Sequence, residues 1–213
     1  MIDLITKQNA GVHGELLSRM FRQRYRVFKE KLGWDVEHVD GEERDQFDRP
    51  DAAYLIATDD SGRIEGSWRL LPTTRPYMAS TVFAELFDGR EPPASDDIWE
   101  CSRFAIDPFE RRMMPSGVDE TTASLFIAIV EFAVTCGVRE IVTVEDIAVA
   151  RLIRQAFDVR PIWRGSVHRL GATRAVLARY EINGALLARL RSSFEPPAPI
   201  IKQLALWDAP RAA

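Results

Sequence analysis

Several charged residues occupy positions where the hydrophobic pattern of the chain calls for apolar side chains. At 100° per residue, Arg24 lies in the middle of the apolar stripe of a predicted N-terminal helix, between Met20 and Phe28. A guanidinium buried there must be paired with an acid, because an unpaired buried charge costs several kcal/mol. A salt bridge that anchors the helix would be enough to explain this residue alone.

Charges that could converge with that guanidinium lie in three other segments. Asp45 and Asp48 belong to a long acidic loop and are its natural partners. Arg69 ends one predicted strand, and Glu100 and Arg103 lie inside another. For any one of these residues an exposed charge on a strand is an equally good explanation. Charges of both signs from four segments of a small protein favour a converging polar site, where pKa values are shifted and protons are transferred.

The elements that must position these residues alternate between helical and strand patterns. We expect helices over residues 15–32, 81–87, 120–136, 147–157 and 184–193, a loop over 35–52, and strands over 54–58, 64–71, 99–106, 139–144, 161–168 and 174–180. This order predicts an α/β fold, an α/β/α sandwich in which helices cover both faces of a twisted mixed sheet. Without a repeat or linker, residues 1–213 are expected to form one domain, with residues 195–213 as a peripheral tail.

Composition and missing motifs exclude several classes of function. The net charge of −4 gives no basic field for nucleic acid. The three histidines have no ligand spacing and the two cysteines form no CxxC pair, so we expect no metal site and a reducing compartment. GxG, GxxxxGK, GxSxG and HExxH motifs are absent. With neither a signal peptide nor an apolar run of membrane-spanning length, we expect a cytoplasmic protein that does not enter a membrane.

Four motifs, in this order, resemble those of the acyl-homoserine-lactone synthases, the bacterial autoinducer synthases of quorum sensing. The motifs are RYRVFKEKLGW with Arg24, Phe28 and Trp34, DQFD with Asp45 and Asp48, WRLLPTTRPYM with Arg69, and WECSRF with Glu100, Ser102, Arg103 and Phe104. The resemblance covers most of the chain at compatible spacing. It implies a fold similar to that of the GNAT-type N-acetyltransferases, in agreement with the predicted elements.

The resemblance implies an acyltransferase with two substrates and no permanently bound cofactor. S-adenosyl-L-methionine supplies the homoserine moiety, and an acyl thioester on acyl carrier protein or coenzyme A supplies the acyl chain. The products are N-acyl-L-homoserine lactone, methylthioadenosine and the free thiol carrier. The choice between the two donors, and the identity of the acyl chain, stay open at this point.

The same motifs imply which residues catalyse the reaction and which bind S-adenosyl-methionine. The implied catalytic set is Arg24, Asp45, Asp48, Arg69, Glu100 and Arg103. The implied binding set is Phe28, Trp34, Ser102 and Phe104. By family position Glu100 would deprotonate the substrate amine, whose reference pKa is about 7.7–8.0. The arginines would orient carboxylates, the aspartates would hold the ammonium group and the arginines, and the aromatic faces would contact the adenine or the sulfonium.

The acyl donor needs its own contacts. The phosphopantetheine arm is expected beside the loop over residues 111–117, where amides at the following helix N-terminus could bind phosphate, although a solvated basic loop is equally plausible. The acyl chain requires an apolar tunnel. The residues expected to bind the arm or the chain are Arg111, Arg112, Phe126, Val142, Thr143 and Trp163.

One geometric difficulty leads to a structural prediction. Glu100 and Arg103 are three residues apart, so an ideal strand would point them to opposite faces of the sheet. If both line one site, a bulge is required near Cys101 and Ser102.

Two other functions fit the same sequence. One is a GNAT-like N-acyltransferase that acts on a different amine and makes no lactone. The other is a non-catalytic protein of the same fold that senses a ligand.

Overall fold

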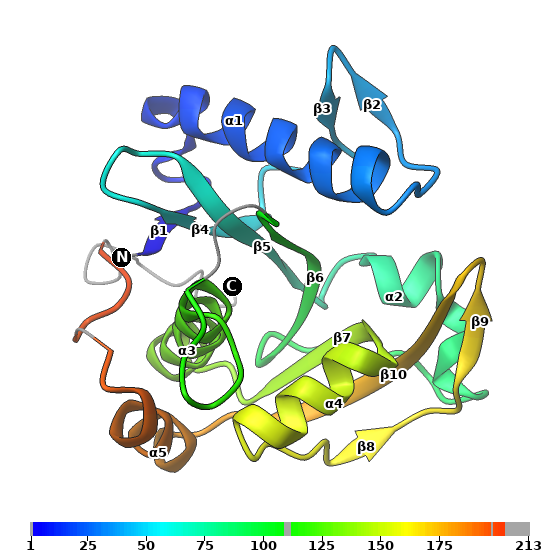
Figure 1. Ribbon diagram of the computed structural model, residues 1–213. Helices are drawn as coiled ribbons and strands as arrows, with labels where there is room; N and C mark the ends of the chain where they lie inside the picture. The colour runs from blue at the N-terminus through cyan, green and yellow to red at the C-terminus, as the bar shows by residue number, and fades with distance from the viewer. Residues whose placement is uncertain (1, 109–111, 197, 203–213) are drawn as a thin grey trace.

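The computed structural model describes residues 2–108, 112–196 and 198–202 of the chain. A mixed sheet runs through its centre in the order β1–β4–β5–β6–β7–β10–β8, and β9 also pairs with β10 (Figure 1). Strands β6 and β7 are parallel, whereas the other neighbouring pairs of this sheet are antiparallel. The strands are β1 (Ile2–Ile5), β4 (Ala53–Thr58), β5 (Ile64–Pro72), β6 (Ile98–Ile106), β7 (Glu140–Asp146), β8 (Trp163–Arg164), β9 (His168–Leu170) and β10 (Thr173–Glu181).

Helices cover both faces of this sheet, as Figure 1 shows for α1 and α3. On one face lie α3 (Glu120–Cys136), α4 (Ile147–Ala156) and α5 (Gly184–Phe194), whose apolar side chains share a core with Leu55 and Leu70 of the sheet. On the other face lie α1 (Gly14–Tyr25) and α2 (Met78–Thr81), which share a second core with Ile56 and Leu71. The predicted mixed sheet with helices on both faces is confirmed.

Helix α3 is apolar on nearly all sides because it packs between the sheet and α5. The Asp119 carboxylate caps its N-terminus by accepting a hydrogen bond from the Thr122 amide at 2.8 Å. Gly137, with φ of 73°, ends the helix in the left-handed conformation that favours glycine. Neither α3 nor any other helix in the described part of the chain is long and apolar enough to cross a bilayer.

Strand β6 contains a bulge that changes the direction of its side chains. Ala105 of β6 pairs with Ser67 of β5, and Ser102 pairs with Arg69. Two residues of β6 therefore lie opposite one residue of β5. Arg103 lies at this irregularity with φ of 58°, a region that residues other than glycine rarely occupy. The prediction of a bulge in this strand is confirmed, one or two residues later than expected. The parallel pairing of β6 with β7 ends at Cys101, just before the bulge.

The first helix and the acidic loop differ from the prediction. The helix expected over residues 15–32 consists of α1 and a π-helical segment, Arg26–Lys31. Here the Leu32 amide donates to the Val27 carbonyl oxygen, five residues back, at 3.0 Å. The loop expected over residues 35–52 contains a hairpin of β2 (His38–Val39) and β3 (Glu42–Glu43), and β3 packs against α1 (Figure 1).

Four further differences concern short elements and the tail. Strand β1 is absent from the elements that the sequence pattern predicts. The helix expected over residues 81–87 is α2 followed by a separate 3₁₀ turn, Ala84–Phe87, and the strand expected over 161–168 is divided between β8 and β9. In the segment expected as a peripheral tail, Glu195, Ala198 and Pro199 are exposed, whereas Ile200 and Ile201 are buried and the Ile2 amide donates to the Ile200 carbonyl oxygen at 3.1 Å. The part of the tail from residue 203 lies outside the described residues.

Candidate active site

Arg24 occupies the buried side of α1, where only 1% of its surface is exposed. Its Nη1 and Nη2 atoms donate to Oδ1 and Oδ2 of Asp48 at 2.8 and 2.9 Å, a parallel bidentate pair. Its Nε atom donates to the carboxylate of Glu43, at the end of β3. The prediction that an acid pairs with this guanidinium is confirmed, and its hydrogen-bonding edges are taken up by carboxylates of the protein itself.

Glu43 belongs to this cluster although no motif singled it out. It is fully buried, and its Oε1 atom accepts a hydrogen bond from Nε of Arg103 at 3.0 Å, so it bridges two arginines. The hairpin that presents it turns at Asp40 and Gly41, which have φ of 52° and 76°. Asp-Gly is a strong signal for such a two-residue turn. This signal could have predicted the hairpin, but its strands of two residues each are too short for alternation to identify Glu43.

Arg69 and Arg103 bring the two central strands to the same acids. Nη1 of Arg69 on β5 donates to Asp45 and, at 3.1 Å, to Asp48. Nη2 of Arg103 on β6 lies 2.8 Å from Oδ2 of Asp45. The Arg69 side chain is completely buried, whereas 11% of the Arg103 side chain is exposed. Guanidiniums from α1, β5 and β6 therefore meet the carboxylates of residues 43–48, and the guanidinium of Arg103 is the most accessible of the three.

The charges of this cluster stabilise one another. Burial by itself would raise the pKa of Asp48, but the charge and hydrogen bonds of Arg24 and the charge of Arg69 outweigh burial and hold that pKa well below its usual range. Burial likewise opposes the charge of Arg24, and the pKa of Arg24 is nevertheless raised because Asp48 and Glu43 surround it. Asp48 and Arg24 therefore stabilise each other in their charged forms.

Glu100 lies beside the cluster and accepts hydrogen bonds from the start of α2. Its carboxylate oxygens accept from the amides of Ala79 at 2.6 Å and Met78 at 3.2 Å, and it also bonds to the Ser102 side chain. Burial raises the pKa of Glu100, and these hydrogen bonds and the charge of Arg69 offset burial only in part. Glu100 is thus a carboxylate with increased affinity for a proton, held in a fixed orientation.

Met78 and Ser102 join Glu100 to the arginines. The Sδ atom of Met78 lies 3.2 Å from Nη1 of Arg103 and 3.7 Å from Nη2 of Arg69. The Ser102 hydroxyl oxygen accepts from Nε of Arg69 at 3.1 Å. All six residues of the predicted catalytic set therefore lie in one contiguous site.

An aromatic pair borders the accessible side of the site. The rings of Phe28 and Trp34 are stacked, with centroids 5.3 Å apart and planes 5° from parallel, and the Arg103 guanidinium lies 5.7 Å from the Phe28 centroid. Trp34 is 40% exposed. By contrast, the ring of Phe104 packs on Trp68 at 4.5 Å, in the core shared with α3. Of the residues expected to bind S-adenosyl-methionine, Phe104 is thus the one whose side chain points away from the cluster.

Comparison with known proteins identifies the family to which this site belongs. Residues 8–184 match the autoinducer synthase family. The chain belongs to the autoinducer synthase family. An acyl-homoserine-lactone synthase of Aliivibrio fischeri is 38% identical over 174 residues, which cover 81% of this chain and 90% of that protein. One of Pseudomonas aeruginosa is 36% identical over 172 residues, with 79% and 84% covered.

Solved structures agree with this assignment. One is BjaI, a CoA-dependent acyl-homoserine lactone synthase solved with S-adenosyl-methionine and isopentyl-CoA. It superposes with a TM-score of 0.84 at 27% identity, and the match covers 100% of this chain and 95% of the BjaI chain. The acyl-homoserine-lactone synthase LasI has a TM-score of 0.78 at 32% identity, covering 90% and 94%. The predicted GNAT-like fold and acyltransferase family of this autoinducer synthase are confirmed.

The residues expected to hold the acyl chain of this autoinducer synthase lie on both faces of the sheet. Val142 and Trp163 pack in the core shared with α1, whereas Phe126 stacks on Phe157 at 4.1 Å in the core shared with α3. Thr143, which is buried, alternates with Val142 and so faces the α3 side. The structure therefore brings Phe126 and Thr143 to one face and does not place all four residues around one tunnel.

Of the two arginines expected beside the pantetheine arm, the structure describes Arg112. The Arg112 side chain is almost fully exposed, with Nη1 3.8 Å from Glu120. Arg111 lies outside the described residues.

A further buried acid of this autoinducer synthase is Glu145, on β7. Its Oε1 atom accepts a hydrogen bond from the Tyr180 hydroxyl at 2.7 Å, and burial raises its pKa to about 7.

Proposed function

We propose that this autoinducer synthase makes N-acyl-L-homoserine lactone from S-adenosyl-L-methionine and an acyl thioester, and releases methylthioadenosine and the free thiol carrier. The observation that carries the proposal is one contiguous cluster formed by Arg24, Asp45, Asp48, Arg69, Glu100 and Arg103. Binding of S-adenosyl-methionine and isopentyl-CoA by the similar synthase BjaI supports it. We further propose that residues 1–213 act as one catalytic unit in the cytoplasm.

The charge balance of the cluster suits this substrate. Three guanidiniums face the carboxylates of Glu43, Asp45 and Asp48, and Glu100 adds a fourth carboxylate. When Glu100 is ionised the site therefore has one negative charge in excess. S-adenosyl-methionine with a protonated amine has a net positive charge, because its sulfonium is added to an amino acid zwitterion. The site and the substrate are complementary.

We assign the roles of the arginines from their exposure. Arg103 is the most accessible guanidinium, and we propose that it binds the substrate carboxylate, next to the Phe28–Trp34 pair, which would contact the sulfonium or the adenine. Arg24 is fully engaged with Asp48 and Glu43 and is a positioning residue. This departs from the expectation that all three arginines orient substrate carboxylates.

The first chemical step is acyl transfer. We propose that Glu100 takes a proton from the substrate ammonium, directly or through one water, and that the amine then attacks the thioester carbonyl carbon. The tetrahedral intermediate collapses with cleavage of the C–S bond. The attacking nitrogen loses its second proton to become an amide, the thiolate takes up a proton, and the carrier leaves as a free thiol. Donors for the oxyanion would come from amides near Ser102–Phe104, where the bulge interrupts the ladder between β5 and β6.

The second step is lactone formation. The substrate carboxylate attacks its own γ-carbon, the C–S bond of the sulfonium breaks, and methylthioadenosine leaves as a neutral thioether. The leaving group is already activated, so the protein has only to hold the chain in the conformation for closing a five-membered ring. An arginine fork on the carboxylate and an aromatic face beside the sulfonium would fix both ends of that conformation.

Mass spectrometry of extracts tests the proposal. A bacterial host that makes no lactone of its own would express the chain, and its culture extract would be compared with that of a host expressing the Glu100→Gln variant. A new N-acyl-homoserine lactone in the first extract alone is the expected result. Other acylated amines would instead indicate a different N-acyltransferase. No product, with ligand binding retained, would indicate a sensor.

A further inference from the structure

Glu145 on β7 is a buried acid that does not belong to the charged cluster. Only 5% of its surface is exposed. Its Oε1 atom accepts the hydrogen bond from the Tyr180 hydroxyl of the neighbouring strand β10, whereas its Oε2 atom is buried and has no hydrogen-bond partner within the described ranges. Because a buried polar atom without a partner lowers stability, a carboxyl group at this position calls for a role other than folding.

Glu145 lies near the point where β6 and β7 separate. The parallel pairing of these strands ends at Cys101 and Thr143, and Glu145 follows two residues later on β7, about 7 Å along the strand. Strand alternation puts Glu145 on the same face as Thr143, and Tyr180 belongs to the core of that face, which α3 covers. Glu100, next to Cys101 on β6, projects to the opposite face, where it meets the start of α2. A substrate whose amine meets Glu100 and whose acyl group crosses the sheet beyond this last pair would therefore bring the acyl group beside Glu145.

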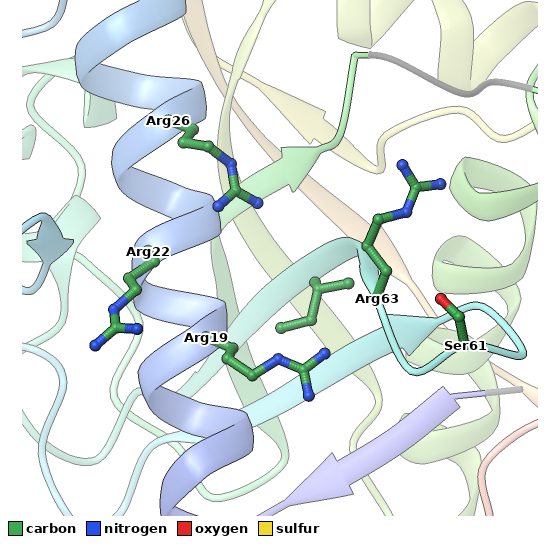
Figure 2. A pocket seen from close by; sticks show the side chains of 6 residues that line it. Arg19, Arg22, Arg26, Ser61 and Arg63 are labelled. Carbon is green, nitrogen blue, oxygen red and sulfur yellow. The ribbon is translucent and has the colours of Figure 1, made fainter.

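The two faces of the sheet suit different parts of such a substrate. On the α1 face, besides the charged cluster, a hollow of about 390 Å³ between α1 and the β4–β5 turn is lined mostly by arginines (Figure 2). On the other face, Phe126 of α3 and Val149 and Leu152 of α4 pack against the core but keep part of their surface exposed. Helix α4 contacts β7 and β10, the strands that carry Glu145 and Tyr180. The charged face thus suits the amino acid part of the substrate, and the apolar face suits an acyl chain.

The second oxygen of Glu145 defines which acyl chain would fit. Because Tyr180 occupies Oε1, Oε2 is the atom that remains for a ligand. An ionised carboxylate only accepts hydrogen bonds, whereas a protonated one also donates. Burial raises the pKa of Glu145 to about 7, so both forms are populated near neutral pH. A hydroxyl can donate to the first form and accept from the second, whereas a plain hydrocarbon chain would leave Oε2 unpaired.

We propose that Glu145, held in place by Tyr180, selects an acyl group that carries a hydroxyl; this rests on the proposed function and adds the chemical class of the acyl donor. The acyl hydroxyl bonds to Oε2 of Glu145, and the hydrocarbon part of the acyl group contacts the half-buried apolar side chains of α3 and α4. A site built to bond a hydroxyl discriminates strongly against the analogue that lacks it, because the buried partner is then left unpaired. Tyr180 acts through Glu145 and is a positioning residue.

Pairs of acyl thioesters that differ only by a hydroxyl test this selection. Straight-chain thioesters of four to twelve carbons would be prepared plain, with a β-hydroxyl and with an ω-hydroxyl, on coenzyme A and on acyl carrier protein. The kcat/KM for lactone formation would be measured with each donor. We expect the unmodified protein to favour one hydroxylated series over the plain series at least about tenfold. The ratio between two donors on one preparation does not depend on the fraction of the protein that is folded.

Variants at both residues assign the preference to the pair. Glu145→Met keeps the length of the side chain but has no carboxyl oxygen, so it should bring the ratio between the two donors to within about twofold of unity. Glu145→Gln keeps one oxygen and gains an amide donor and should retain most of the preference, whereas Tyr180→Phe should lower it about three- to tenfold. Glu140→Gln is the matched control, because Glu140 lies at the other end of β7 and pairs with Arg179; its ratio should equal that of the unmodified protein.

Two results would overturn the proposal. One is an unmodified protein that uses plain donors as well as hydroxylated ones, or better. The other is a Glu145→Met variant that keeps the preference of the unmodified protein. Lactone made from plain thioesters in either case would leave the proposed function standing, whereas no lactone from any donor would reject that function and the selection with it.

Discussion

The substitution Glu43→Gln removes one buried negative charge and almost no volume. Glu43 is fully buried between the guanidiniums of Arg24 and Arg103, and each of its oxygens accepts a hydrogen bond from one of them. A glutamine keeps one acceptor oxygen but places an amide NH₂ group, which can only donate, against the other arginine. One guanidinium would therefore lose its hydrogen bond to this residue, and both would lose a charged partner.

The expected loss in the free energy of unfolding follows from the burial of Glu43 together with the two arginines. Removing one partner of a buried ion pair costs about 3–5 kcal/mol, out of a total free energy of unfolding of about 5–15 kcal/mol. For a chain of this size each kcal/mol lowers the melting temperature by about 2–4 °C, so Glu43→Gln should melt roughly 6–20 °C below the unmodified protein. Urea denaturation and thermal unfolding, both followed by tryptophan fluorescence, measure this loss.

The neighbouring residue gives a matched control. Glu42 lies on the same strand and accepts a hydrogen bond from the Ser18 hydroxyl, but its charged partners Arg22 and Arg44 are largely exposed. Glu42→Gln should therefore cost no more than about 1 kcal/mol. If the two variants unfold within about 1 kcal/mol of each other, Glu43 does not hold two desolvated guanidiniums, and the description of the charged cluster is wrong.

Three further predictions concern catalysis and pH. Glu100→Gln should lower turnover by about 10²–10⁴ without unfolding the protein, and near-normal turnover in a steady-state assay would remove its role as base. Arg103→Lys should lower kcat/KM for S-adenosyl-methionine by at least about tenfold despite the conserved charge, because a lysine cannot reproduce a bidentate fork; unchanged kinetics would contradict that role. Burial raises the pKa of Glu145 to about 7, so the folded state keeps a proton that the unfolded state has released, and stability should fall by up to about 3 kcal/mol between about pH 4.5 and 7. Glu145→Gln should abolish this fall and melt above the unmodified protein at pH 8, whereas superimposable profiles of melting temperature against pH would refute the assignment.

The charged residues of the site were predictable from the sequence because they occupy positions that the hydrophobic pattern assigns to apolar side chains, where a charge needs a partner. Arg24 stood out on the helical wheel, and an acid partner followed from the cost of burying a lone guanidinium. The spacing of Glu100 and Arg103 conflicted with strand alternation, and that conflict predicted the bulge at which Arg103 now lies with positive φ. In both cases the sequence departs from the regular pattern of a helix or strand at a residue of the charged cluster.

Other features depended on tertiary packing that periodicity does not contain. Glu43 lies in a strand of two residues, too short for a pattern to reveal. Phe126, Val142 and Trp163 are expected around the acyl chain as apolar residues and Thr143 by its position in the family, but which face of the sheet each side chain lies on depends on how the elements pack. Val142 and Thr143 are neighbours on β7, so strand alternation alone puts them on opposite faces. Ile200 and Ile201 pack beside β1, a strand that was itself not predicted.

The ratio of products formed by the purified protein tests the central proposal most directly. With S-adenosyl-methionine labelled in its methionine carbons and an acyl thioester, quantitative mass spectrometry would follow lactone, methylthioadenosine and free thiol in one reaction. The charged site described above predicts labelled acyl-homoserine lactone in equal amounts with both other products. Thiol released without methylthioadenosine, or a lactone without the label, would contradict it.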